Sequence, residues 1–468
     1  MHSSRFLHCL FVGTLLLIIL WNWTSLAQGA KTLTLEESID IARQTNLSIQ
    51  TLQEEVKSTE AQARAARAVL LPHVSISSTY TYFKDLAKSV LDFGGAGFPF
   101  PPTGAMGETP PTTGNGAASP SAEPVEIEFG AHHNFQGTLA LRQPLFAWGR
   151  YYYHYQSAQL NLDAARKGLE AGYNQLTRDV TQAFYGVLVA TEFVRVAQQT
   201  VDLVEKQLQL SRNLFESGAA TNFDVLRAEV QLANAKSQLI RAQNSVRLAT
   251  DAYKNILNIN LGEEIEVKGS FEPPRVELNL ESLIQTAMEK RPEIHQLELS
   301  ERASQKRVDV AKTGNRPDLS FFANYQVDDN EKLKEMNKIW NVGFALNIPI
   351  FDGLATRAAV QQAKSGLNQT RLVKQQLMDA IEFEVRSAYL NLIQAQSLIE
   401  VQKETVAQAQ EGVRLANLRY ENGMLTSVEL TDAQLALAQA EVNRLQATHD
   451  YVVGLATLEK AIGTKLGQ

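Results

Sequence analysis

The sequence predicts a mainly α-helical fold that also contributes β-strands to a membrane barrel. Three observations predict it. The chain contains one unit twice, at a constant spacing over a long stretch. Each copy holds apolar residues at seven-residue intervals, which is the pattern of a coiled coil. Each copy also holds two segments of about 10–13 residues that alternate between apolar and polar side chains, the length of a tilted membrane-spanning strand.

Composition narrows the possible functions. The chain has 468 residues, with 44 basic and 51 acidic side chains and a formal net charge of -7. This balance offers no basic face of the kind that nucleic-acid binding usually needs. Beyond the N-terminus no apolar stretch reaches the roughly 18 residues of a membrane-spanning helix. Any membrane-spanning part is therefore expected to consist of strands.

The N-terminus is typical of a secretory signal peptide over residues 1–27. Leu10 to Leu20 form an apolar run, and Ser25-Leu26-Ala27 carries small residues where a signal peptidase reads the chain. A transmembrane anchor is the alternative, but the run is short and Asn22 follows it closely. Cleavage after Ala27 removes Cys9, the only cysteine. The mature chain is then expected to have neither a disulfide nor a cysteine metal site.

The internal repeat sets the expected domain organisation. A spacing of 205 residues relates Gln143-Pro-Leu-Phe146 to Ile348-Pro-Ile-Phe351, and a spacing of 245 residues relates Pro72 to Pro317. The difference of 40 residues is an insertion in the first copy. We expect a first repeat over residues 28–254, an inter-repeat linker over 255–279 and a second repeat over 280–468.

Each repeat is expected to run helix, strand, loop, strand, very long helix, tight turn, helix. The first long helix is expected from about Arg150 to Phe215, on the order of 100 Å, which no compact globule accommodates. Its apolar row at seven-residue intervals comprises Leu162, Leu169, Leu176, Ala183, Ala190, Ala197 and Val204. The partner helices carry alanine at every second core position, which lets helix backbones approach closely.

Four segments are expected to form strands. They begin near Val74, Phe135, Leu319 and Ile339 and alternate with period two. A soluble sandwich is the alternative, but its strands average only about 5–6 residues. The first inter-strand segment, residues 84–134, is rich in proline and glycine and is expected to be an irregular loop. A role for it as a lid or recognition surface is the alternative.

Four strands cannot close a membrane barrel, because an open edge in lipid leaves backbone groups without hydrogen bonds. The chain is therefore expected to oligomerise. Two copies would give eight strands and a barrel filled by side chains, whereas three copies would give twelve strands with room for a water-filled bore.

Several motifs resemble those of the TolC-type outer-membrane efflux proteins, the outer membrane factors. They are the signal peptide, the opening Leu33-Thr-Leu-Glu-Glu-Ser-Ile-Asp-Ile-Ala, the Pro-Leu-Phe strand end and the turns that begin at Phe215 and Tyr420. The resemblance covers essentially the whole mature chain. It implies a homotrimer in the outer membrane, with a twelve-stranded β-barrel and an α-helical tunnel (α-barrel) in the periplasm. It also implies an exit duct of a tripartite efflux or type I secretion system, joined to an inner-membrane transporter by a periplasmic adaptor protein.

The resemblance also implies site residues at the two helix turns. The adaptor-docking turns would comprise Gly218, Ala219, Gly423 and Met424, and the periplasmic gate Asp224, Tyr420, Glu429 and Asp432. The family's arginine latch is replaced here by Leu425. The residues themselves allow simpler interpretations: Thr221-Asn-Phe-Asp224 and Thr426-Ser-Val-Glu429 fit helix capping boxes, and Tyr420 continues an apolar row. Asp432 is not explained by capping.

No catalytic or cofactor-binding constellation is evident. His132 and His133 have no acidic or cysteine partners at metal-site spacing, and the sequence has no phosphate-binding Gly-Lys-Ser/Thr loop. We therefore expect no enzyme activity, no cofactor and no metal. A periplasmic coiled-coil adaptor and an envelope-spanning structural protein are the alternatives to a duct.

Overall fold

The computed structural model describes residues 31–91, 125–129, 132–269, 271, 278–330 and 337–466. The signal peptide expected over residues 1–27, with its cleavage site at Ala27, lies outside them. The chain divides into two compact units. The helical unit comprises Met1–Ala63, Gln156–Val308 and Gln361–Gln468, and the strand unit comprises Arg64–Tyr155 and Asp309–Val360.

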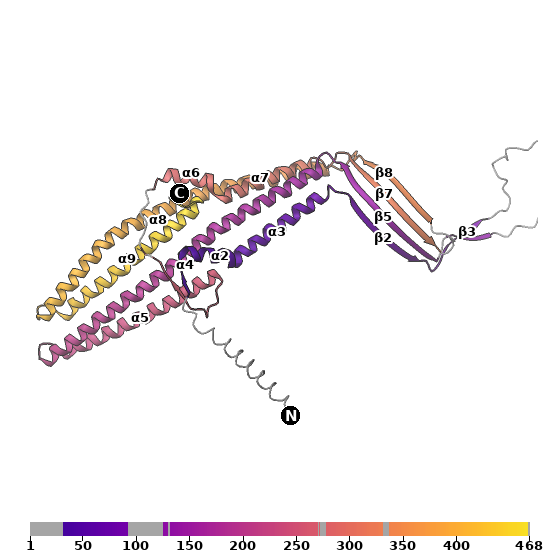
Figure 1. Cartoon of the computed structure of the whole chain (residues 1–468). Coiled ribbons are helices and arrows are strands. Elements are labelled where there is room, and N and C mark those ends of the chain that lie inside the picture. Colours follow the sequence, from indigo (N-terminus) through magenta and orange to yellow (C-terminus); the bar gives the residue numbers. More distant parts are fainter. Residues whose placement is uncertain are drawn as a thin grey trace, which may run out of the picture. The chain divides into compact units, whose positions relative to one another are not determined.

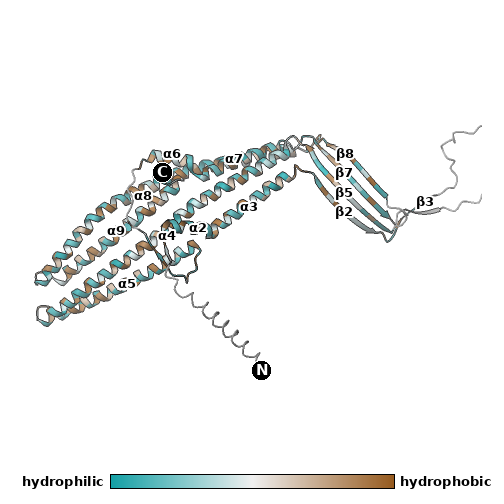
Figure 2. Ribbon diagram, viewed as in Figure 1, coloured by the Kyte–Doolittle hydropathy of each residue, from teal (hydrophilic) through white to brown (hydrophobic). Residues whose placement is uncertain are grey.

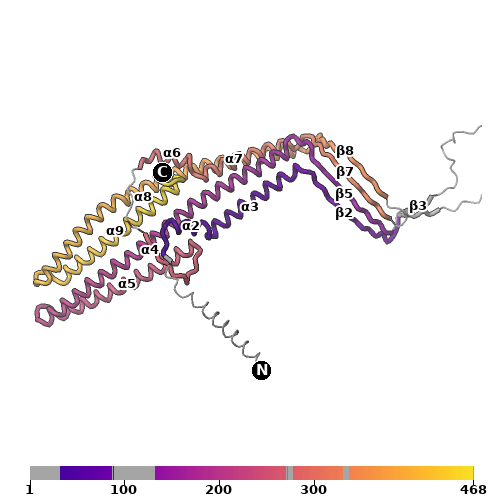
Figure 3. Tube along the Cα trace, viewed as in Figure 1, coloured from indigo at the N-terminus to yellow at the C-terminus, as the bar shows by residue number. Residues whose placement is uncertain are grey.

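The strand unit contains a four-stranded antiparallel sheet. Its strands are β2 (His73–Tyr82), β5 (His133–Phe146), β7 (Asp318–Asn330) and β8 (Asn337–Asn347), in the order β2-β5-β7-β8. The two strands of the first repeat thus lie beside the two strands of the second (Figures 1 and 3). Among the described residues, β2 and β8 each pair on one side only and form the edges of the sheet.

One face of this sheet is apolar and exposed. Ile76, Leu139, Tyr325 and Trp340 lie directly opposite one another across the four strands. All four are exposed, Ile76 to 83% and Trp340 to 72%. The neighbouring row, Ser75, Ala140, Asn324 and Asn341, lies on the other face, because successive residues of a strand point to opposite sides. Figure 2 shows the resulting alternation along the strands.

The prediction of an irregular loop over residues 84–134 is wrong in two places. β3 (Ala87–Leu91) and β4 (Val125–Phe129) pair antiparallel within it. Their sequences, Ala-Lys-Ser-Val-Leu and Val-Glu-Ile-Glu-Phe, favour strands through β-branched residues. The proline and glycine between them dominated the composition of the segment. Residues 92–124 lie outside the described part of the chain.

The helical unit shows the repeat in its helix lengths. α4 (Arg150–Glu216) and α8 (Ala355–Glu421) have 67 residues each, and their partners α5 (Asn222–Leu257) and α9 (Ser427–Ile462) have 36 each. Shorter helices precede them in both halves: α2 (Leu35–Thr45) and α3 (Leu47–Ala68), then α6 (Leu280–Lys290) and α7 (Pro292–Ala311). None of the described helices is long and apolar enough to cross a membrane.

Each half packs its own core. In the first half, Phe184 of α4 and Tyr253 of α5 are fully buried with Ile49 of α3. In the second half, Leu392 of α8 and Leu458 of α9 occupy the corresponding region with residues of α6 and α7. From the predicted apolar row of α4, Leu176 is buried in the first core and Leu169 and Ala183 pack against it. Phe184 and Ile49 were not part of any predicted row.

The segment expected as a linker over residues 255–279 contains ordered structure that the sequence analysis did not predict. α5 continues to Leu257, and β6 (Ile265–Val267) then pairs parallel with β1 (Lys31–Leu33). A three-residue strand has too few residues to show alternation, so it is recognised only from its partner. This pairing links the beginning of the first repeat to the segment that follows it.

Candidate functional site

Both helix pairs end in the same kind of turn. Gly218 and Gly423 have φ angles of 77° and 71°, the left-handed conformation that commonly ends a helix. Open space surrounds the position of a Cβ at both, so the backbone angle, not crowding, favours glycine. Ala219 donates its N–H to the carbonyl of Leu214, at 2.8 Å. Met424 donates to Arg419 in the same way, at 2.9 Å.

The four residues expected to dock an adaptor lie on the exposed tips of these turns. Gly218, Ala219, Gly423 and Met424 are all exposed. The Met424 side chain is 68% exposed, and one further large apolar side chain near the turns, Phe223, is 70% exposed. Phe223 was not among the residues singled out from the sequence. Its place two residues after Thr221, where the turn ends, is the signal that identifies it.

Asp224 and Glu429 cap the helices that follow the turns. The Thr221 N–H and hydroxyl donate to Oδ2 of Asp224 at 3.0 and 2.7 Å, and the Thr426 N–H and hydroxyl donate to Glu429 at 2.9 and 2.8 Å. Both form complete capping boxes. Hydrogen bonds from the Thr221 side chain and backbone lower the pKa of Asp224, and bonds from the Thr426 backbone and side chain lower that of Glu429.

Asp224 also contacts the second turn. Its other oxygen, Oδ1, accepts a hydrogen bond from the Ser427 hydroxyl at 3.1 Å. Ser427 is the first residue of α9 and is buried. The Asp224 carboxylate therefore caps the start of α5 and also links the turn of the first repeat to the turn of the second.

Tyr420 makes a second contact between the halves. Its side chain is 5% exposed and packs with Leu430 and Leu425, while its hydroxyl forms a hydrogen bond of 3.0 Å with the buried hydroxyl of Ser211 on α4. Tyr420 is therefore part of an apolar core and also forms a hydrogen bond with a residue of the first repeat. Leu425, which was expected to replace an arginine latch, belongs to the same apolar cluster.

Glu429 and Asp432 do not join these contacts. Glu429 is exposed and bonds within its own turn, and Asp432 is exposed one turn further along α9. The structure thus brings Asp224 and Tyr420 to contacts between the repeats and leaves the other two expected gate acids at the surface of one helix. Across the described residues, no group of three or more His, Cys, Asp or Glu side chains is arranged to hold a metal ion.

Sequence reasoning missed the two serines that complete the contacts. Ser211 stands seven residues after Val204, in the row that begins with Leu162. A small polar residue in an apolar row was the available signal. Ser427 directly follows the capping threonine, and nothing in its local sequence distinguishes it.

The comparisons with known proteins agree with one another. The sequence pattern of the family described as "outer membrane efflux protein" matches residues 38–258 and 283–464. "Nodulation protein T" of Rhizobium leguminosarum bv. trifolii is 24% identical over 327 residues, which cover 68% of this chain and 70% of that protein. "Outer membrane protein TolC" of Vibrio cholerae is 22% identical over 328 residues, covering 66% and 74%.

The fold is also found among solved structures. The CmeC outer membrane channel of Campylobacter jejuni superposes with a TM-score of 0.74 at 17% sequence identity. The match covers 93% of this chain and 87% of that one. The duplicated arrangement of long helical hairpins and four strands is therefore an established architecture.

Proposed function

Because this chain belongs to the outer membrane efflux protein family, we propose that three copies form a passive exit duct through the outer membrane. The strands of the three copies close a twelve-stranded barrel in the lipid, and the helices form a tunnel in the periplasm. An adaptor protein docks at the exposed turns and connects the duct to an inner-membrane transporter. Energy for export comes from that transporter.

One observation carries the proposal: the sheet has an exposed apolar face and two open edges. A row such as Ile76, Leu139, Tyr325 and Trp340 would be unfavourable in water, since burying apolar surface contributes about 25 cal/mol per Å². Lipid contact removes this cost. The edges β2 and β8 each carry backbone groups that a neighbouring copy can pair, which closes the barrel.

The contacts between the turns support a gate. Asp224 with Ser427, and Tyr420 with Ser211, join the helix pair of the first repeat to that of the second near the exposed tips. Opening the tunnel would separate the two pairs and break both contacts. We assign to them the task of holding the closed state, in place of the polar latch that Leu425 cannot provide.

The proposal is tested with purified protein in mild detergent and in a planar bilayer. Sedimentation should give a trimer, and insertion should give discrete conductance steps, because twelve strands enclose a water-filled bore. An adaptor or a structural coiled-coil protein would give no conductance. A stable folded monomer, or a folded trimer that never conducts, would remove the proposal.

A further prediction concerns Asp432. Three copies of this exposed carboxylate around a narrow bore would concentrate negative field and attract cations. A trivalent cation added from the periplasmic side should therefore block the pore, and Asp432→Asn should weaken the block without changing trimer stability. Glu429→Gln is the matched comparison. Because the Glu429 carboxylate is engaged in its capping box, this substitution should leave the block unchanged. Unchanged block in Asp432→Asn would place this carboxylate outside the bore.

A further inference from the structure

The two repeats differ in charge at one equivalent position. In the second half, Glu384 of α8 accepts hydrogen bonds from Arg291, between α6 and α7, and from Lys460 of α9, the latter at 2.8 Å. Arg291 also donates to Glu293 at 2.8 Å and is only 3% exposed. A guanidinium and an ammonium, each on an aliphatic stem, therefore fill this space between the helices.

The first half keeps the acid and lacks both cations. The repeat spacings place Asp179 at the position of Glu384, Asn46 at that of Arg291 and Asn255 at that of Lys460. The backbone confirms the correspondence: Asn46 and Arg291 both end a short helix, and they donate their N–H groups to the equivalent carbonyls of Ala42 and Ala287.

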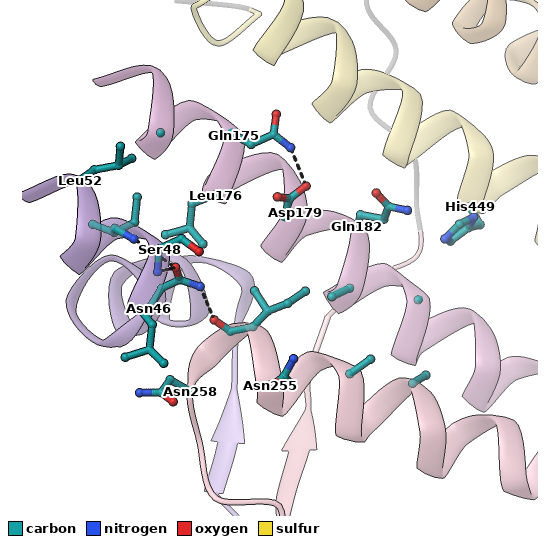
Figure 4. Close-up of a pocket in the computed structure, with 18 residues that line it drawn as sticks. Asn46, Ser48, Leu52, Gln175, Leu176, Asp179, Gln182, Asn255, Asn258 and His449 are labelled. Atoms are coloured by element: carbon teal, nitrogen blue, oxygen red, sulfur yellow. Dashed lines mark hydrogen bonds between the residues drawn. The ribbon is translucent and has the colours of Figure 1, made fainter. Parts of the chain in front are cut away.

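A pocket lies where the two cations would be. It has a volume of about 880 Å³, and Asn46, Asp179 and Asn255 are among its lining residues (Figure 4). Apolar side chains, including Leu52 and Ile256, supply the rest of the wall. The pocket thus combines a carboxylate, neutral amides and apolar surface. We call it the Asp179 pocket.

The carboxylate of Asp179 is only partly engaged. Gln175 donates to its Oδ1 at 2.9 Å, and Arg178 of the same helix donates to the same oxygen at 2.5 Å. Among the described residues, no donor reaches Oδ2. His449 of α9 also lines the pocket and has its Nδ1 3.2 Å from its neighbour Asp450. Arg178 offsets part of the charge from one side, whereas in the second half two cations converge on the acid from two other elements.

We propose that the Asp179 pocket binds an alkylguanidinium or alkylammonium group, with Asp179 as its counter-ion. The chemistry follows from the second half, where groups of this kind occupy the equivalent space. The apolar wall would contact the aliphatic stem, and the side-chain oxygen of Asn255 would accept from one of the cation's remaining N–H groups. The side-chain oxygen of Asn46 already accepts the N–H groups of Ser48 and Ile49 at the start of α3, so Asn46 contributes to the wall alone. The group comes either from a free small molecule or from an Arg or Lys side chain of another copy of this chain.

The test uses the full chain in detergent, with butylguanidinium as the probe and neutral butylurea as the comparison ligand, measured by isothermal titration. Butylguanidinium should bind saturably and more tightly than butylurea. Asp179→Asn should weaken its binding about tenfold, the size of one lost charged hydrogen bond. Asn46→Arg, which places an internal guanidinium in the pocket and keeps Asp179, should also block binding.

Asp202→Asn is the matched control. Asp202 lies on the same helix and accepts from Gln198, four residues earlier, at 2.8 Å, as Asp179 does from Gln175. Binding should be unchanged in this variant. If another copy already supplies the cation, the wild type will not bind the probe, and Asp179→Asn will dissociate the oligomer more readily than Asp202→Asn does. If Asp179→Asn matches Asp202→Asn in both measurements, the proposal is overturned. Neither measurement requires transport, so failure here leaves the duct proposal standing.

Discussion

Replacing Arg291 with methionine is expected to lower the free energy of unfolding by about 3 kcal/mol, which is the low end of the cost of breaking a buried ion pair. The guanidinium is 3% exposed and hydrogen-bonds both Glu293 and Glu384. Methionine fills much of the same volume but leaves two carboxylates without their main partner. The low end applies because those carboxylates are 25% and 33% exposed, so water recovers part of the loss.

Denaturant unfolding in detergent measures this cost. Arg302→Met on the neighbouring helix α7 is the control, because Arg302 is exposed and such surface changes usually stay within about 0.5 kcal/mol. Equal stability of the two variants would show that the ion pairs of Arg291 with Glu293 and Glu384 contribute nothing to the free energy of unfolding. The helices of the second half would then be held by apolar packing alone.

The same variant should change the dependence of stability on pH. Burial alone would raise the pKa of Glu293 and of Glu384, but hydrogen bonds from Arg291, and for Glu384 also from Lys460, outweigh it and lower both. A lowered folded-state pKa contributes stability above the unfolded value, about 4.3, and this contribution is lost as the pH falls below it. The difference between wild type and Arg291→Met should therefore be largest near neutral pH and shrink in acid.

The sequence predicted most of the fold because the relevant signals are periodic and occur twice. Seven-residue apolar rows indicated α4 and α8, and period-two alternation indicated the four sheet strands. The sequence analysis missed the short strands, which form only by pairing with another strand. β1 with β6, and β3 with β4, are short strands whose identity comes from a partner far along the chain. The proline-rich and glycine-rich composition of residues 92–124 concealed the pair formed by β3 and β4.

The candidate site divides in the same way. Gly218, Gly423 and the two capping boxes are encoded by residues within one turn of each other, so the local sequence was sufficient. The contact of Asp224 with Ser427 spans 203 residues, and that of Tyr420 with Ser211 spans 209. These pairs depend on how the two hairpins pack, which no local pattern reports. The charge difference between Asn46 and Arg291 was visible by aligning the repeats, but its meaning required the pocket.

The largest functional effect is expected from removing both contacts between the turns, in the variant Tyr420→Phe with Ser427→Ala. Each substitution deletes one hydroxyl and keeps most of the side-chain volume. Asp224 retains its capping bonds to Thr221, so the helix start remains intact. Tyr420→Phe additionally leaves the fully buried hydroxyl of Ser211 without its partner on α8. The loss of these two hydrogen bonds destabilises the closed state alone, because in the open state Asp224 and Ser211 would hydrogen-bond to water.

The size of the effect follows from the trimer proposed above. One hydrogen bond contributes about 1 kcal/mol net, so three copies of one contact contribute about 3 kcal/mol if the subunits open together. That corresponds to roughly a 100-fold change in the ratio of closed to open channels, and the double variant exceeds it. Single-channel recording should therefore show a large rise in open time and in mean conductance. Ser217→Ala with Tyr173→Phe is the matched control, since Ser217 donates to Leu214 of the preceding helix α4 and Tyr173 accepts from Gln53 of α3, all within the first repeat. If the double variant conducts no more than this control, the two contacts do not hold the tunnel closed. Closure would then come from the contacts that remain, which are the hydrogen bonds of Thr431 with Gln231 and Gln207 and the apolar packing around Leu425 and Leu430.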